Sequence, residues 1–297
     1  MANEAEGPAG SIFDLGYRRY AGERLGRRYA IESLYIHSLR AAFGIGRSLL
    51  SKAFPIGLAL IALVPAAIQL GIAAVIPQRI SIIRPENYFS FVQVILALFC
   101  TAVAPDLIGR DQQTRTLPLY FSRPLSRADY VSAKLGALIS ALLIVVLLPQ
   151  AVLFTGNALA TEDSLAYLRD DLDQVPSILA SAATVAVFMA SLSLAVACQT
   201  PRRVYATGAV LVSSVVFSAL GRILVHSTSG DLRMYSVLVS PLDVLQGSVT
   251  WLFGARPEAN SDIALAGLPG GLYLLAACVY SVVALAVLYR RFQRLPA

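Results

Sequence analysis

The residues best suited to chemistry in this sequence lie in one polar segment between two long apolar runs. Six charged side chains lie in this segment, with four large apolar ones among them. The charged residues are Arg110, Asp111, Arg115, Arg123, Arg127 and Asp129, and the apolar ones are Leu117, Leu119, Tyr120 and Phe121. A solvated loop has little reason to carry so many apolar residues, whereas a short amphipathic helix uses them to enter a groove on a partner. The segment therefore predicts a protein-docking site.

The order of residues within this segment also predicts its shape. Arg123 precedes Pro124, and a residue before proline is pushed out of the helical region of backbone space. Ser126 and Asp129 stand three residues apart just before the next apolar run, as in a capping box. We expect, in order, the end of a membrane helix, a short docking helix, a proline turn and a capped helix start.

The remaining reactive residues offer little for catalysis. His37 and His226 fall on opposite sides of the expected membrane and cannot share a site. Cys100, Cys198 and Cys278 lie within apolar runs, where thiols usually serve as small packing residues. No Gly-x-x-x-x-Gly-Lys-Ser/Thr loop for binding ATP phosphates occurs in the sequence. We expect no catalytic residue, metal or cofactor in this chain.

Composition indicates which elements must position the polar segment. The 297 residues are 57% hydrophobic and 14% charged, with a mean hydropathy of +0.66, whereas soluble domains are about 45–50% apolar and about 25% charged. A membrane helix needs about 20 apolar residues. Six windows meet this need: Phe54–Ile76, Tyr88–Leu107, Tyr130–Leu153, Ser177–Gln199, Val204–Val225 and Leu272–Tyr289. We therefore expect an all-α polytopic membrane protein with six transmembrane helices.

The distribution of Lys and Arg predicts the orientation of these spans. Residues 1–10 carry Glu4 and Glu6 and do not resemble a secretory signal, so we expect both termini in the cytosol. Six of the 24 basic residues then fall on the outer side, and the rest on the cytosolic side; the six are Arg79, Arg84, Arg169, Arg222, Arg233 and Arg256. Because the cytosolic charge is shared among several segments, we expect no nucleic-acid partner.

Two flanking elements complete the expected organisation. Apolar residues between Ile31 and Leu50 recur at helical spacing, which predicts an amphipathic helix on the inner membrane surface. We expect residues 1–53 to form a cytosolic segment with this helix, residues 54–291 the transmembrane domain, and residues 292–297 a cytosolic tail. Within the outer connection 227–271, we expect residues 241–254 to dip into the outer leaflet, with Trp251 at the interface.

The polar segment also carries a family resemblance. The pattern Arg-Asp-x4-Thr-Leu-x5-Arg-Pro-Leu-Ser-Arg-x2-Tyr-x3-Lys, which runs from Arg110 to Lys134, resembles the first cytosolic loop of ABC-2 type transporter permeases. The six-span layout, the helix before the first span and the basic tail after Tyr289 are similar too. One residue departs from the family pattern, because Arg115 stands where a glycine usually precedes Thr-Leu.

The resemblance implies that loop 106–130 contains a coupling helix, which fits a cleft on a separate ABC ATPase subunit. It assigns this coupling to Asp111, Thr116, Leu117, Leu119, Phe121, Arg123, Pro124, Ser126 and Arg127. The implied complex pairs two permease copies, identical or related, with two ATPases that hold ATP and Mg. It implies a bacterial or archaeal plasma membrane, and a substrate route lined by spans two and five.

The expected function is therefore that of a permease subunit in an ATP-driven exporter. Charge is nearly absent from the spans, which favours a hydrophobic or amphiphilic substrate. Two alternatives stay open at this point. The chain could be a non-transporting membrane scaffold that recruits a cytosolic ATPase. It could also be an ion-coupled secondary transporter, although such proteins usually carry ionisable residues within their spans.

Overall fold

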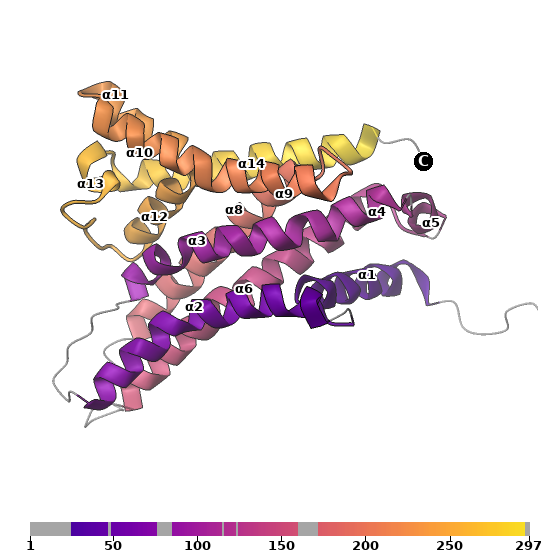
Figure 1. The fold of residues 1–297 in the computed structure, drawn as a ribbon, viewed down its shortest axis with the longest axis horizontal. Helices are drawn as coiled ribbons and strands as arrows, with labels where there is room; N and C mark the ends of the chain where they lie inside the picture. The colour runs from indigo at the N-terminus through magenta and orange to yellow at the C-terminus, as the bar shows by residue number, and fades with distance from the viewer. Residues whose placement is uncertain are drawn as a thin grey trace, which may run out of the picture.

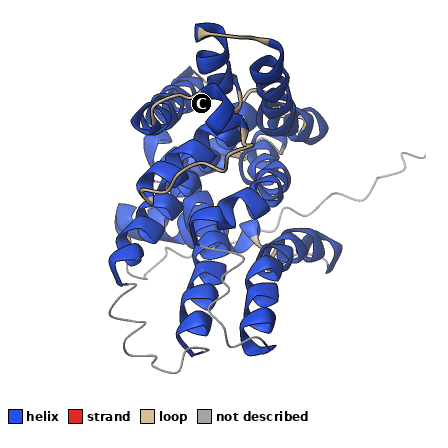
Figure 2. Ribbon diagram, turned by 90° about the vertical axis from the view of Figure 1, so that its left-hand side faces the viewer, coloured by secondary structure: helices blue, strands red, loops and turns tan. Residues whose placement is uncertain are grey.

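The computed structural model describes residues 25–46, 49–75, 85–114, 116–122, 124–159 and 172–294. Within these ranges every regular element is helical (Figures 1 and 2). Six of the helices are long and apolar enough to cross a membrane: Lys52–Ile72, Pro85–Gln113, Arg127–Gly156, Leu172–Ala197, Arg203–Ser227 and Gly270–Arg294. Each overlaps one predicted window, which confirms the all-α, six-span class. Several helices extend beyond their windows, because backbone hydrogen bonding continues into polar turns that hydropathy does not mark.

Each span consists of one or more helical elements (Figure 1). In chain order, the elements are α1 (Gly26–Ala42), α2 (Leu49–Val75), α3 (Pro85–Ala104), η1 (Pro105–Gly109), α4 (Arg110–Gln113), α5 (Leu117–Phe121), α6 (Arg127–Leu159), η2 (Leu172–Gln174), α8 (Val175–Ala197), α9 (Arg203–Leu211), η3 (Val212–Val216), α10 (Phe217–Ser227), α11 (Asp231–Ser236), η4 (Val237–Val239), α12 (Pro241–Leu252), α13 (Asp262–Ala266) and α14 (Gly270–Arg294).

The core of the bundle forms around α8 and α3. Helix α8 contacts α3, α6, α9, α12 and α14. Its buried face is rich in small residues, including Ala182, Ala186 and Ala190, and small side chains let helix backbones approach closely within a membrane. In contrast, α2, α10 and α14 leave many large apolar side chains exposed. Such surfaces suit contact with lipid.

Spans two and five are each interrupted by a π-helical segment. In span two, η1 begins at Pro105, which has no N–H to donate to the preceding turn. In span five, η3 separates α9 from α10. Single π-helical turns inside α-helices are frequent at functional sites. These are also the two spans that the family resemblance places along the substrate route.

Helix α1, the expected helix before the first span, packs along the first turns of α6. Arg27 reaches Asp129, and the Tyr35 hydroxyl lies 2.7 Å from Ser140 Oγ. The two contacts advance together along both helices, so α1 runs alongside α6 in the same direction. With 33 residues, α6 is about 50 Å long, which exceeds the hydrocarbon core of about 30 Å. Its first turns can therefore support α1; a location at the inner membrane surface stays a prediction.

The apolar stretch 241–254, which the sequence predicts on the outer side, forms the helix α12, which is inserted into the bundle. Its buried face packs against α3, α8 and α14. Gly247 does not interrupt this helix; instead it allows close packing, because an added Cβ would lie 2.4 Å from Cγ of Tyr273. Trp251, expected at the membrane interface, is about half exposed.

Candidate functional site between spans two and three

The polar segment has the predicted shape. Span two continues through η1 and α4 to Gln113, and a turn follows in which Thr116 N donates to Asp111 O over 3.1 Å. Helix α5 then forms the short helix, exposed Pro124 follows it, and α6 starts at Arg127. Arg115, where the sequence departs from the family pattern, and Arg123 lie outside the described residues.

The start of α6 is a reciprocal capping box, as the sequence predicts. Ser126 N donates to Asp129 Oδ2 over 2.9 Å, and Asp129 N donates to Ser126 Oγ over 3.1 Å. The two bonds satisfy amide groups that the first turn of a helix leaves without partners. Asp129 also accepts two hydrogen bonds from Arg27, at 2.8 and 2.9 Å. Helix α1 is therefore tied to the same turn.

Asp111 faces the interior of the protein. One carboxylate oxygen, Oδ2, lies 2.8 Å from Lys134 Nζ and accepts a 2.7 Å hydrogen bond from the Tyr130 hydroxyl. Lys134 is only 4% exposed and Tyr130 is fully buried. A buried charge is strongly unfavourable without a partner, so this pair joins α4 firmly to α6. Lys134 and Tyr130 both belong to the recognised pattern, yet sequence reasoning did not assign them to the site.

An aromatic cluster joins α5 to two spans. The ring of Tyr130 contacts those of Tyr120 and Phe121 from α5 and that of Phe292 from α14, with centroids 5.7, 6.2 and 5.3 Å apart. Arg127 lies over the Phe121 ring and donates a 2.6 Å hydrogen bond to the Gln293 carbonyl. Tyr130 is thus the point where α5, α6 and the end of α14 meet.

The opposite side of α5 is open to solvent. Leu119 is 68% exposed, and Pro118, Ser122 and Pro124 are exposed with it. Leu117 points inward and is 8% exposed, while Thr116 and Phe121 are partly buried. The predicted coupling residues therefore divide into two groups. Leu119, Pro124 and Ser126 are exposed and can meet a partner directly. Asp111 and Leu117 face the interior, and Phe121 and Arg127 link α5 to α6 and α14.

Figure 1 places α5 at one end of a helical bundle, beyond the ends of the spans that flank it. The fold and this site together define a polytopic α-helical membrane protein with a rigidly held helix on one face. A model of the family described as ABC-2 family transporter protein matches residues 78–295. The chain belongs to this family and is the membrane subunit of an ABC transporter, which works with an ABC ATPase subunit. No curated protein matches the chain in a sequence search.

Proposed function

We propose that this chain is the permease subunit of an ATP-driven exporter in a bacterial or archaeal plasma membrane. Its substrate is hydrophobic or amphiphilic, and ATP is hydrolysed with Mg on a separate subunit. The observation that carries the proposal is the two-sided character of α5. Leu119, in the middle of α5, is exposed, while Tyr120 and Phe121 are anchored on Tyr130. A helix of this kind suits the transmission of force from a partner into the bundle.

The contacts of α5 suggest how movement of the ATPase reaches the spans. A partner groove that closes on Leu119 displaces α5, and the aromatic cluster passes this displacement to α6 and α14. The Asp111–Lys134 ion pair prevents α4 from separating from α6, so span two moves with them. In a complex of two permeases and two ATPases, these displacements re-pack the spans and open the route between the permease copies.

The charge distribution supports the proposed substrate class. Asp106 lies 2.9 Å from Arg203, and Asp111 lies 2.8 Å from Lys134, both near the end of the bundle that carries α5. Arg222 forms its ion pairs at the opposite end. The middle of the spans is left to apolar and uncharged polar side chains. A multiply charged substrate would find few counter-charges there.

The docking role of α5 is tested by Leu119→Asp, which places a charge on the exposed side of α5. We expect co-purification of the ATPase to fall at least about tenfold, since about 1.4 kcal/mol of lost binding energy has that effect. Leu119 is a better test position than Phe121, whose ring packs on Tyr130. The control is Leu232→Asp, the same change at a 74% exposed leucine on α11.

Unchanged binding of the ATPase to Leu119→Asp would contradict the docking assignment. Transport itself is tested by ATP-dependent movement of lipid-like substrates in vesicles that contain both subunits. A complex that binds and hydrolyses ATP without moving any substrate would favour the scaffold alternative. Movement driven by an ion gradient without ATP would favour the secondary transporter.

A further inference from the structure

Span five is built as two halves with different neighbours. The first half, α9, packs against α3, α8 and η1. The second half, α10, packs instead against η4, α11, α12 and α13. Between them lies the π-helical segment η3, where the regular hydrogen-bond ladder changes register. Span five therefore changes from one set of neighbours to another at η3.

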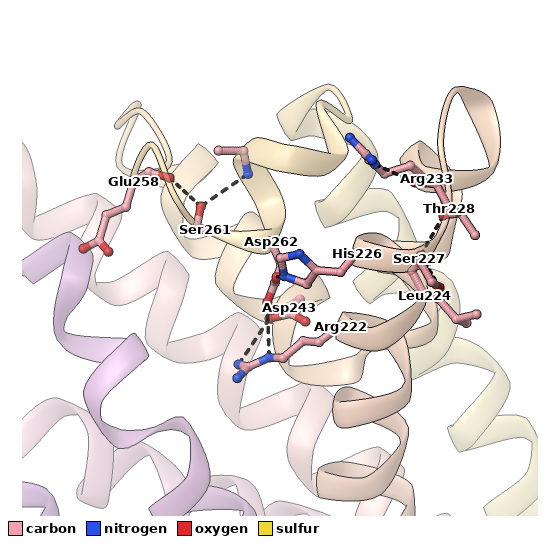
Figure 3. Close-up of polar contacts among 11 residues, drawn as sticks. Arg222, Leu224, His226, Ser227, Thr228, Arg233, Asp243, Glu258, Ser261 and Asp262 are labelled. Carbon is pink, nitrogen blue, oxygen red and sulfur yellow. Dashed lines mark hydrogen bonds and ion pairs between the residues drawn. The ribbon is translucent and has the colours of Figure 1, made fainter.

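The far end of α10, opposite α5, is held by a cluster of charged side chains from three helices (Figure 3). Arg222 Nε lies 3.3 Å from Asp262 Oδ2, and Arg222 Nη2 lies 3.6 Å from Asp243 Oδ1. One turn further along α10, His226 Nε2 lies 2.9 Å from Asp262 Oδ1. We call these four residues the Arg222 latch. It joins α10 to the first turns of α12 and α13.

Beneath the latch, the backbone of α10 touches the start of α12. Gly221 lies so close to Ser240 that an added Cβ would stand 2.6 Å from Ser240 Cβ. One turn earlier, Ser218 Oγ accepts a 3.2 Å hydrogen bond from Leu242 N. Ser240 is fully buried by this contact. Lifting α10 would expose Ser240 and the first turn of α12.

The charges in the latch differ in their exposure. The side chains of Arg222 and His226 are 47% and 61% exposed, whereas that of Asp243 is 6% exposed. Among the described residues, Asp243 Oδ2 has no hydrogen-bond partner. Burial raises the pKa of the Asp243 carboxyl, and the charge of Arg222 opposes this shift. Arg222 therefore compensates a buried carboxylate, although its own guanidinium is open to solvent.

We propose that α10 is an outer gate of the transport route, which turns about η3 and is held closed by the Arg222 latch. The proposal rests on the transport function proposed above. It adds the residues that control release of the substrate at the end opposite α5. The Arg222 and His226 side chains are open to solvent, which suits a contact that must break and re-form in every cycle. Only one side of α10 is held in this way. Its other side exposes Phe217, Leu220 and Ile223.

The test measures how fast a membrane-impermeant maleimide labels a cysteine at position 240. Ser240→Cys is introduced after Cys100, Cys198 and Cys278 have been replaced by alanine. A second reporter, Ser227→Cys, is exposed at the same end in the closed state and controls for sidedness. In the parent without ATP, we expect position 240 to react at least tenfold more slowly than position 227.

Removal of the latch should expose position 240 without any nucleotide. We expect Arg222→Gln and, independently, Asp262→Asn to increase its labelling rate at least threefold. The matched control is Arg233→Gln, which removes an arginine at the same end whose Nε donates to the Thr228 carbonyl. If one latch variant fails to fold, the labelling rate of the other variant tests the proposal. Equal labelling rates in the parent and in the folded latch variants would overturn the proposal.

A second arm adds the native ATPase and ATP, and it separates this proposal from the proposed function. ATP should accelerate labelling at position 240 in the parent, and less so in Arg222→Gln, which is already open. ATP-driven substrate movement without any change in labelling would show that α10 is not the gate. Absence of ATP-driven movement, with the latch variants labelling faster, would instead overturn the transport function and leave the latch in place.

Discussion

The polar residues of the coupling segment take up two distinct roles, which their chemical types alone do not reveal. Asp111 and Arg127 are as polar as a surface contact requires, yet both bind other parts of the protein. Asp111 pairs with buried Lys134, and Arg127 binds the Gln293 carbonyl at the end of α14. Leu119, an apolar candidate, is 68% exposed. Burial thus separates residues that position α5 from residues that can bind the ATPase.

The buried Asp111–Lys134 pair should be sensitive to loss of one partner. Lys134→Met leaves the Asp111 carboxylate with the Tyr130 hydroxyl and no cation. We expect the free energy of unfolding in mixed micelles to fall by about 3 kcal/mol, the lower part of the range for breaking a buried pair, because Asp111 is slightly exposed. The double variant Lys134→Met with Asp111→Asn should recover most of this loss, since no uncompensated charge remains.

The matched control for this experiment is Arg203→Met. Its ion pair with Asp106 has a similar length of 2.9 Å, but the Arg203 side chain is 64% exposed. Exposed pairs contribute about 0–1 kcal/mol. An equal loss of stability in Arg203→Met and Lys134→Met would show that burial does not distinguish the two pairs.

At the scale of elements, the structure is held together by a few close approaches between helices. Helix α1 lies beside the first turns of α6, α5 rests on the aromatic cluster at Tyr130, and α12 enters the bundle between α3, α8 and α14. The α12 contact includes one glycine at a close approach. This residue is Gly247, against which the Tyr273 ring packs.

The packing of α12 can be tested with Gly247→Ala. The added methyl group would overlap the Tyr273 ring, so α12 and α14 must separate. We expect a loss of about 1–3 kcal/mol in the free energy of unfolding, the usual cost of overpacking a core. Gly208→Ala on α9 is the control, because its added Cβ meets nothing within 4 Å. There the gain in helix propensity should leave stability unchanged or about 0.5–1 kcal/mol higher. A larger loss of stability in Gly208→Ala than in Gly247→Ala would contradict the observed packing.

In the whole molecule, the side-chain clusters with proposed functions lie at the two ends of the bundle. The end that carries α5 holds the Asp111–Lys134 pair and the aromatic cluster, and the far end holds the Arg222 latch (Figures 1 and 3). Spans two and five connect the two ends, and each contains a π-helical segment. This arrangement suits a transporter that receives force on one side of a membrane and releases substrate on the other.

This arrangement functions as proposed only if α5 and the chain termini face the cytosol. Green fluorescent protein fused after Ala297 should then fluoresce in a bacterial host. Alkaline phosphatase inserted at Asn260, in the exposed connection before α13, should be active, since it folds only outside the cytosol. The same two reporters exchanged between these positions form the control. Activity of the exchanged pair, with both original fusions inactive, would reverse the proposed orientation.

Local sequence sufficed for the class of the protein, the number of spans, and the order of turn and helix in the coupling segment. Apolar length, a proline and a capping pair act within a few residues, so their effects can be read without the fold. Tertiary structure decided which way each polar side chain faces. Asp111 meets Lys134 only because the chain reverses after α4 and α6 runs back along span two, and Arg222 meets Asp262 across forty residues of chain. Contacts between distant segments depend on how helices pack, and hydropathy and spacing do not determine that packing.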